Sequence, residues 1–313
     1  MNIAFIACVE QGNLENQVLL LCRSIRKYAG RYRNAPIYCF QPRKGPPLSH
    51  ATLTQFRNLH VEYNADILNK DYAYYPIANK IVSCARAEAT LSEDILVFVD
   101  SDTLFVNEPK ELLLPDDINA AVRPVNKKRK GSTGTGDRNE GYWQKLYAMC
   151  GVSAAPFVFT TIGSQKIRAY WNAGLIVVRR SQGIFHAWQK DFQTLMAAKH
   201  YPSDSRGITI NNMDQLALAA TLAKIAERVC TLDYRYNYPL PLRTSLPQVS
   251  RTAQLEDLVH IHYFRYFNIP GFLESLQPSL NQQSEIYQWL KQFLPFSPIM
   301  TTSTLRKPRY VPK

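Results

Sequence analysis

Residues 95–106 of the chain read Ile95-Leu96-Val97-Phe98-Val99-Asp100-Ser101-Asp102-Thr103-Leu104-Phe105-Val106. Five apolar residues lead directly into two carboxylates that are one residue apart, and a second apolar run follows them. A continuous apolar run of this length predicts a buried central strand. Because residues i and i+2 of an extended segment point the same way, Asp100 and Asp102 can converge where this strand ends.

Two converging carboxylates repel each other unless a cation lies between them. A hard divalent cation is the simplest candidate, because Mg²⁺ and Mn²⁺ bind oxygen ligands well. Asp-x-Asp triplets are also common in turns, where an Asp side chain bonds its own backbone. The buried strand favours the metal, since open α/β sheets bind their ligands at the carboxyl ends of their strands.

The segments around this strand alternate between the two kinds of secondary structure. A strand at 2–9, a helix at 16–27 and a strand at 35–40 form a β-α-β unit, for which a parallel pair with a right-handed crossover is expected. A helix at 76–91 precedes the Asp pair. Further strands are expected at 60–63, 120–124, 175–178, 228–232 and 258–264, and further helices at 185–199, 211–225 and 284–294. The pattern predicts an α/β protein with a central, mostly parallel sheet flanked by helices.

The totals favour an intracellular globular protein. The 313 residues are 46% apolar and 20% charged, which is ordinary for globular domains. The cysteines are widely spaced without a Cys-x-x-Cys pair, so free thiols are expected rather than disulfides or a zinc site. The chain begins on a strand signal without a basic, apolar leader, and no apolar run approaches the roughly 18 residues that span a bilayer. We therefore expect a soluble, cytoplasmic protein.

The charge balance points to anionic partners. A net charge of +12 suits nucleic acid, a phosphorylated substrate or an anionic membrane surface. No nucleic-acid motif is present, so a phosphorylated substrate and peripheral contact with a membrane are favoured. The segment 126–137 holds four consecutive cations, Lys127 to Lys130, and three glycines. It is not a phosphate-binding P-loop, because Asp137 stands where that motif needs Lys. A mobile basic loop is expected, and closure of that loop over an anionic ligand is the alternative.

Four motifs follow one another along the chain: the Asp pair, Asn172-Ala173-Gly174, Asp214-Gln215 and His262-Tyr263. In this order the chain resembles a nucleotide-sugar glycosyltransferase of the GT-A fold, and in particular family 8, the glycogenin and lipopolysaccharide galactosyltransferase group. The resemblance covers most of residues 1–270. It implies transfer of a hexose from a nucleoside diphosphate sugar, in the first place a UDP-sugar, with retention of configuration. The acceptor would be a glycan, a lipid-linked molecule or a protein.

The resemblance implies a metal centre and a donor site. Asp100 and Asp102 would hold Mn²⁺, with Mg²⁺ as the alternative, and His262 would complete the site. His260 lies on the same strand face and is an alternative third ligand. Asp214 would bind sugar hydroxyls and Gln215 would face the reacting carbon, although Asp at a helix start is also a common cap. The remaining donor contacts implied are Ala7, Cys8 and Glu10 for the nucleotide, Ser101, Asn172, Ala173 and Gly174, and Arg86 with Lys80 as its alternative.

The segment after His262 departs from the family pattern. Residues 263–267 contain neither the Gly nor the phosphate-binding Lys of the family, and Arg265 would take the place of that Lys. On this interpretation residues 1–295 form a single catalytic domain with a mobile insertion at 126–169. Residues 296–313 are expected to be a disordered basic tail.

Two other classes share part of the pattern. A haloacid-dehalogenase-like phosphatase also has Asp-x-Asp after an apolar strand, but it needs Thr or Val two residues beyond the second Asp, whereas Thr103 is adjacent to it. A non-catalytic nucleotide- or glycan-binding protein on the same fold is the second alternative.

Overall fold

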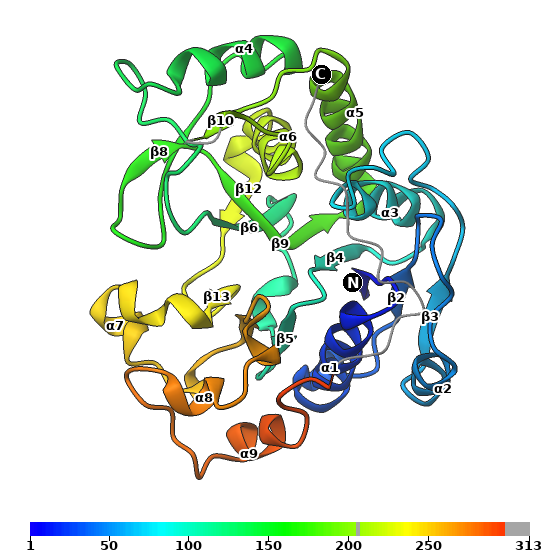
Figure 1. Cartoon of the computed structure of the whole chain (residues 1–313). Helices are drawn as coiled ribbons and strands as arrows, with labels where there is room; N and C mark the ends of the chain where they lie inside the picture. The colour runs from blue at the N-terminus through cyan, green and yellow to red at the C-terminus, as the bar shows by residue number, and fades with distance from the viewer. Residues whose placement is uncertain (205–206, 298–313) are drawn as a thin grey trace.

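The computed structural model describes residues 1–204 and 207–297. Its centre is a seven-stranded sheet with the strand order β12-β6-β9-β4-β1-β2-β3 (Figure 1). The strands of this sheet are β1 (Ile3–Cys8), β2 (Ile37–Phe40), β3 (Val61–Asn64), β4 (Ile95–Val99), β6 (Ala120–Pro124), β9 (Trp171–Arg179) and β12 (Val229–Thr231). The expected α/β architecture with a mostly parallel central sheet is confirmed.

One strand of the sheet runs against the others. β1 pairs in parallel with β2 and β4, and β2 with β3, whereas β9 is antiparallel to both β4 and β6. In the β4–β9 ladder Val99 lies opposite Leu175. The beginning of β9 therefore lies beside the carboxyl end of β4, which places Asn172 near the Asp pair although they are far apart in sequence.

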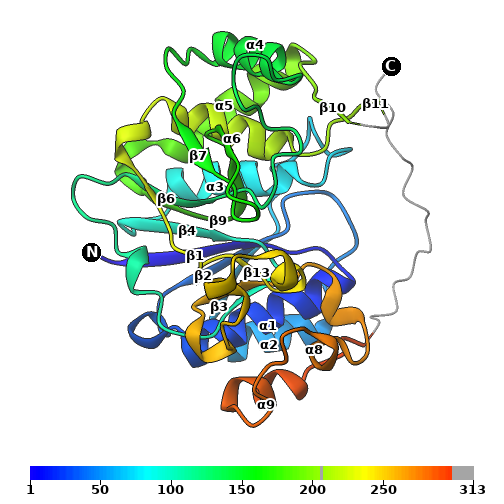
Figure 2. The same cartoon turned by 90° about the vertical axis from the view of Figure 1, so that its left-hand side faces the viewer.

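Helices cover both faces of the sheet. Figure 2 shows α3, α4, α5 and α6 on one side of the strands and α1, α2, α8 and α9 on the other. Their bounds are α1 (Asn13–Tyr28), α2 (His50–Asn58), α3 (Ala78–Thr90), α4 (Glu140–Cys150), α5 (Ile184–Ala197), α6 (Met213–Ala223), α7 (Gln248–Arg251), α8 (Phe272–Ser275) and α9 (Glu285–Lys291). This arrangement makes a three-layer molecule with the sheet in the middle.

The apolar run of β4 is continuous because both of its faces are buried. Leu96 and Phe98 pack in the cluster under α3, α5 and α6, whereas Ile95, Val97 and Val99 pack in the cluster under α1. All five side chains are at most 1% exposed. Alternate residues of a strand face opposite ways, so a strand between two helical layers needs an apolar residue at every position.

A second, small sheet lies beside the first. It consists of β5 (Thr103–Phe105), β14 (His260–His262) and β13 (Tyr238–Pro239), in the order β13-β14-β5. β14 is antiparallel to β5, and His262 lies opposite Thr103. A third apolar cluster, which includes Ile261, packs beneath it together with α8 and α9. The C-terminal part of the described chain is thereby joined to β5, the strand that directly follows the Asp pair.

Residues 126–169 contain more regular structure than the sequence indicated. The expected irregular segment at 126–137 is present, but α4 follows it, and β7 (Phe157–Phe159) and β8 (Lys166–Arg168) form a hairpin. α2 was not predicted either. Short strands β10 (Ser203–Asp204) and β11 (Gly207–Ile208) form a further hairpin.

Other expectations have mixed outcomes. Cys8, Cys22, Cys39, Cys84, Cys150 and Cys230 are all free thiols, as expected. Of the tail expected at 296–313, residues 298–313 lie outside the described residues. Among the residues that are described, no helix has the length and apolarity needed to span a bilayer.

Candidate active site

The edge of the sheet where the parallel strands end collects the chemically active side chains. Asp100 and Asp102 follow β4 directly, and β1, the neighbouring parallel strand, ends at Cys8. The antiparallel pairing of β14 with β5 brings His262 to the same place. The end of β1, the end of β4 and the pairing of β14 with β5 therefore bring residues that are far apart in sequence to one edge of the sheet.

Asp100, Asp102 and His262 form one compact group. One ligand atom from each lies within 4.8 Å of the others. The imidazole Nε2 of His262 is 3.3 Å from Oδ1 of Asp102. Two carboxylates and one imidazole are a donor set that suits Mn²⁺ and also accommodates Mg²⁺.

A chain of hydrogen bonds fixes the orientation of His262. Asn172 Oδ1 accepts hydrogen bonds from Gly174 N (2.8 Å) and from Asn237 Nδ2 (2.9 Å). The amide of Asn237 is therefore oriented with its Oδ1 toward Nδ1 of His262, at 3.0 Å. That ring nitrogen must be the donor, which leaves Nε2 as an acceptor in the neutral imidazole. An acceptor beside the carboxylate of Asp102 needs a cation or a further proton, so the residues fit a metal ion.

Gly174 makes room for the imidazole. A Cβ atom at this position would lie 2.9 Å from Oδ1 of Asn172 and 3.0 Å from both Cε1 and Nδ1 of His262. Both distances are too short for an ordinary contact. The glycine of the Asn-Ala-Gly motif therefore allows the ring to lie directly over the backbone of β9.

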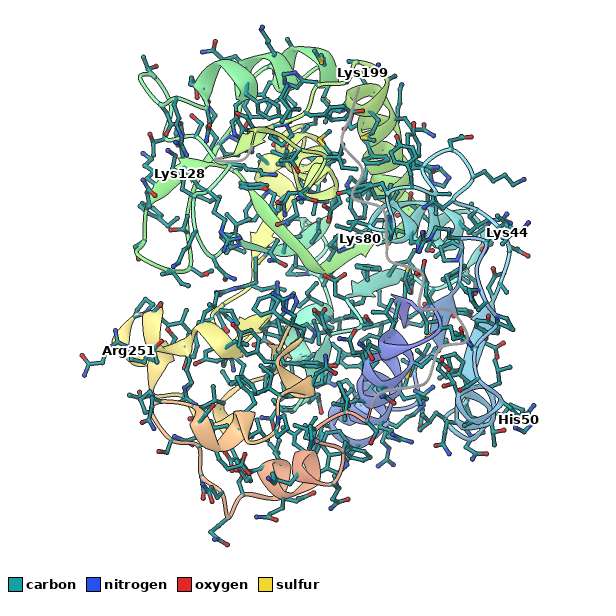
Figure 3. The ribbon with its side chains drawn as sticks, viewed as in Figure 1. Lys44, His50, Lys80, Lys128, Lys199 and Arg251 are labelled. Atoms are coloured by element: carbon teal, nitrogen blue, oxygen red, sulfur yellow. The ribbon has the colours of Figure 1, made fainter. Side chains whose placement is uncertain are left out.

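Lys80 links the Asp pair to the Asp-Gln motif. Its Nζ donates to Oδ1 of Asp100 (2.7 Å) and to the carbonyl of Ala173 (3.3 Å), and it lies 3.6 Å from Oδ2 of Asp214. Figure 3 shows Lys80 near the centre of the molecule. Burial alone would lower the pKa of Lys80, but Asp100 and Asp214 raise it above its ordinary value. The ammonium group thus remains charged and neutralises the buried carboxylate of Asp214 and the partly buried carboxylate of Asp100.

The carboxyls of Asp100 and Asp102 differ in their electrostatic surroundings. Burial raises the pKa of Asp100, and the nearby charge of Asp102 adds to this effect while Lys80 opposes it. Burial also acts to raise the pKa of Asp102, but His262, once its Nε2 carries the further proton, brings it below its ordinary value through its charge and a hydrogen bond. A divalent cation at this position would favour the ionised form of both groups.

A pocket of about 140 Å³, called the β1 pocket below, opens beside Asp100. Its wall includes Cys8, Glu10, Asn79, Lys80 and Ser101. Glu10 accepts two hydrogen bonds from Arg43, at 2.7 and 2.8 Å, and a third from Asn79 at 2.8 Å. The carboxylate of Glu10 is therefore held in one orientation by the protein itself.

A larger pocket, called the basic pocket below, has a volume of about 390 Å³. It is lined by cationic, amide and aromatic residues, which include Lys127, Arg129, Lys130, Arg265, Asn172, Asn212, Gln215, Tyr170 and Phe264. Asp214, the neighbour of Gln215, is only 3% exposed and accepts a hydrogen bond from the hydroxyl of Tyr75 at 3.4 Å. The basic pocket therefore adjoins both the Asp-Gln motif and the segment after His262.

Not all expected residues reach this edge. Arg86 is exposed on α3 and lines neither pocket, whereas Lys80, named as its alternative, lies in the first turn of that helix and contacts Asp100. His260 is fully buried against the ring of Phe105, at 4.6 Å between centroids, and lies outside the compact group. Burial lowers its pKa to about 3. Ala7 is buried within β1.

Several residues of the site were not predicted from the sequence. Asn237, which orients His262, lies in a Tyr- and Pro-rich loop with no recognisable motif. Tyr75 and Arg43, which contact Asp214 and Glu10, lie in segments that were given no function. Gln17 on α1 accepts from the hydroxyl of Ser101 at 3.2 Å. Only the Tyr- and Pro-rich composition near 237 could have drawn attention to that segment.

Comparison with solved structures places this arrangement in a known fold. The galactosyltransferase LgtC, in complex with donor and acceptor sugar analogues, matches 95% of this chain and 98% of its own length at 16% identity, with a TM-score of 0.52. The bifunctional glycosyltransferase WbbM matches at 14% identity and a TM-score of 0.47, and GlyE from Streptococcus pneumoniae at 12% and 0.49. The chain covers 51% of WbbM and 60% of GlyE, and 92% of this chain is matched in each case. The likeness to LgtC shows the GT-A fold.

Comparison of the sequence with protein families gives the activity class. A search of curated proteins found no match to the chain. The model of the Rhodobacterales glycosyltransferase domain matches residues 5–226, which is well over half of the chain. The expectation of a GT-A glycosyltransferase is confirmed. The chain therefore belongs to the Rhodobacterales glycosyltransferase domain family and is a glycosyltransferase.

Proposed function

We propose that the chain transfers a hexose from a nucleoside diphosphate sugar, in the first place a UDP-sugar, to an acceptor hydroxyl. The observation that carries the proposal is the compact Asp100–Asp102–His262 group, with ligand atoms within 4.8 Å of one another, beside two pockets. These three residues would hold Mn²⁺ or Mg²⁺. When bound, such an ion stabilises the negative charge of the leaving diphosphate as a Lewis acid.

The β1 pocket suits the nucleoside. It lies at the carboxyl end of β1, next to Asp100, and Glu10 presents an oriented carboxylate that can accept a hydrogen bond from a base N–H. Cys8 and Ser101 also line it. Burial raises the pKa of the Cys8 thiol to about 12, so this residue contributes shape and not a reactive thiolate. Ala7 is buried within β1 and does not line the pocket.

The basic pocket suits the sugar and the acceptor. Gln215 lines it, and Asp214 lies next to Gln215 in the first turn of α6. The carboxylate of Asp214 has lone pairs left after its contacts with Tyr75 and Lys80, so it can accept hydrogen bonds from sugar hydroxyls. Asn172 forms part of the wall, and Ala173 and Gly174 supply backbone next to it.

The reaction breaks the bond between the anomeric carbon and the diphosphate oxygen. A new bond forms between that carbon and the acceptor oxygen, and the acceptor proton passes to the departing diphosphate. With retention, the acceptor attacks from the same side as the leaving group. Gln215 would face the reacting carbon, and Lys80 positions Asp100 and Asp214 with hydrogen bonds and charge. Arg265, at the mouth of the basic pocket, would add positive charge near the diphosphate.

Hydrolysis of a panel of nucleotide sugars tests the proposal. We expect release of a nucleoside diphosphate from at least one UDP-sugar in the presence of Mn²⁺, and loss of that release when EDTA is added. Asp102→Asn should abolish it and should also abolish metal-dependent binding of UDP in calorimetry. Asp116→Asn, an exposed Asp remote from the pockets, is the matched control and should behave as the unmodified protein.

The outcomes separate the alternatives. Unchanged UDP affinity in Asp102→Asn would defeat the metal assignment. Tight UDP binding without any turnover would favour a non-catalytic nucleotide-binding protein. Release of inorganic phosphate from simple phosphate esters, without a nucleotide sugar, would favour a phosphatase.

The proposal also covers the domain organisation of the chain, its location in the cell and its contact with a membrane. We propose that residues 1–295 act as a single catalytic domain in the cytoplasm, with the segment 126–169 able to move over the bound ligands. The net charge of +12 supports peripheral contact with an anionic membrane that carries a lipid-linked acceptor. Co-sedimentation with vesicles that contain an anionic lipid tests this contact, and equal sedimentation with neutral vesicles would contradict it.

A further inference from the structure

The basic pocket has an unusual charge balance. Four cationic side chains line it, those of Lys127, Arg129, Lys130 and Arg265, and none of the described residues in its wall is Asp or Glu. In a concave, partly enclosed space, charges of one sign reinforce one another and attract an anion. The proposed reaction uses only Arg265 for the donor diphosphate, so Lys127, Arg129 and Lys130 have no assigned role in donor binding.

Three of these cations are not neutralised by the protein. Lys128, which lies between two of them in sequence, pairs with Asp137. The side chains of Lys127, Arg129 and Arg265 have no ion-pair or hydrogen-bond partner in the part of the chain that the structure describes. A guanidinium group offers five N–H donors in a planar fork that matches phosphate and carboxylate oxygens. These donors remain available to a ligand.

The backbone of the pocket supports a binding role. Arg129, Asn212 and Phe264 line the pocket and all have positive φ, at 38°, 71° and 54°. Bulky residues such as Arg and Phe rarely adopt this conformation because it strains the backbone, whereas Asn tolerates it better. Such strain persists where the surrounding structure enforces it, and it is concentrated at ligand sites. The strained backbone conformation of Arg129 is therefore consistent with a role of this pocket in ligand binding.

The cations lie in the same pocket as the residues assigned to the donor sugar, where an acceptor would bind. Gln215 and Asn172, which the proposed reaction assigns to the donor sugar, form part of the wall of the same pocket. Lys127 and Arg129 also line a second hollow, together with Ile162, Gly163 and Gln165. In Figure 3, the labelled Lys128 marks this segment at the margin of the molecule, well apart from Lys80. Lys127 and Arg129 therefore belong to both the basic pocket and this hollow, so an anionic ligand in either one can contact them.

We propose that the acceptor is a negatively charged sugar, whose phosphate or carboxylate group is bound by Lys127 and Arg129. This inference rests on the proposed transferase function and specifies its acceptor. The anionic group holds the acceptor so that its hydroxyl faces the anomeric carbon near Gln215. A neutral sugar lacks this anchor and binds weakly.

Binding of small probes to the full-length protein tests the inference. Glucose, glucose 6-phosphate, glucuronate and inorganic phosphate are titrated by calorimetry, with and without UDP and Mn²⁺. We expect the anionic probes to bind at least about 10-fold more tightly than glucose. Their phosphate or carboxylate group accepts charge-assisted hydrogen bonds from the cations, whereas glucose has no such group. The phosphate and carboxylate arms show which anion the pocket prefers.

Variants locate the effect. Lys127→Gln combined with Arg129→Gln should reduce the preference for anionic probes by about 10- to 100-fold. Lys145→Gln, which removes a charge from the exposed face of α4 and lines neither pocket, is the matched control and should keep the preference. Thermal unfolding of each variant verifies that it is folded.

The possible results are distinguishable. Failure of UDP to bind defeats the proposed function, whatever the sugar probes do. UDP binding together with equal affinities for neutral and anionic probes overturns only the present inference. A double variant that keeps the full anion preference, or that loses affinity for UDP instead, would also overturn it, because the cations would then lie elsewhere or serve the donor.

Discussion

The β1 pocket and the basic pocket differ in whether their charged side chains are paired within the protein. In the β1 pocket each ionised group described above is paired inside the protein: Glu10 with Arg43 at 2.7 Å, and Asp100 with Lys80 at 2.7 Å. In the basic pocket Arg129 has no such partner, and none of the described residues in the wall is acidic.

This difference has energetic consequences. Charges that are paired within the protein are preorganised, so a ligand meets oriented groups and little further ordering is required. Removing one member of such a pair leaves the other buried and unpaired, which destabilises the fold itself. Unpaired surface cations contribute little to folding, and their removal should alter ligand choice alone. Mutations in the two pockets should therefore separate stability from specificity.

The group between the pockets should give the largest effect. His262→Leu removes a proposed metal ligand, and we expect nucleotide-sugar turnover to fall by roughly three orders of magnitude. His260→Leu changes the other histidine of the same strand face. Both ring nitrogens of His260 are buried without a hydrogen-bond partner among the described residues, and orphan polar atoms of this kind cost about 1–3 kcal/mol each.

The pair of variants is compared by turnover and by thermal unfolding. His260→Leu should keep its activity and unfold at the same or a higher temperature than the unmodified protein. If His260→Leu, and not His262→Leu, abolished metal-dependent turnover, the assignment of the third ligand would be reversed.

The second largest effect concerns the free energy of unfolding, which should depend on the cation beside the β1 pocket and not on a cation of the basic pocket. Lys80→Met leaves the buried Asp214 and the partly buried Asp100 without their shared cation, and we expect the free energy of unfolding to fall by about 3 kcal/mol. Lys127→Met in the basic pocket should change it by at most about 0.5 kcal/mol, because that side chain is exposed and unpaired. Urea unfolding of both variants measures the difference. Equal losses of unfolding free energy in the two variants would show that the pairing of Lys80 does not contribute more to stability than the unpaired Lys127.

The sequence predicted the parts of this site that depend on local pattern. The apolar run of β4 and the β-α-β unit before it are sufficient to predict a strand that ends in two carboxylates. The choice between Lys80 and Arg86 could also have been reasoned out. Six residues of helix advance about 9 Å, so only the first-turn residue of α3 can lie at the end of the sheet where the strands finish.

Other features depend on contacts that local pattern does not contain. His260 and His262 share a strand face, and only the pairing of β14 with β5 shows that His262 is the one beside Asp102. The antiparallel direction of β9 is likewise a property of the sheet and not of its own residues. α2 buries only Thr52 and Phe56, so its apolar pattern is too sparse to predict a helix. Asn237 acts through a single side chain in an irregular loop.

The third effect concerns recognition in the β1 pocket. Glu10→Gln removes the charge that holds two hydrogen bonds from Arg43, and we expect the dissociation constant for UDP to rise about 10-fold. Glu62→Gln, on the exposed face of β3, is the matched control and should leave it unchanged. The preference for anionic over neutral sugar probes should be the same in both variants. A change in that preference would mean that the two pockets are coupled and not independent.

Salt should have the smallest effect, and it should act on one pocket only. Raising the ionic strength from about 0.05 M to about 0.5 M shortens the screening length to a few ångströms and weakens attraction between exposed charges. We expect the ratio of affinities for glucose 6-phosphate and glucose to fall about threefold, since Lys127 and Arg129 are exposed. Effects of salt on UDP or on the metal cancel in this ratio, because both sugars are measured with the same loaded protein. Glu10 and Arg43 are partly buried and bonded to each other, so their geometry should not respond to salt. A ratio that stays constant would mean that anions are held by neutral hydrogen-bond donors of the pocket, such as Asn126 or Tyr170, and not by its unpaired cations.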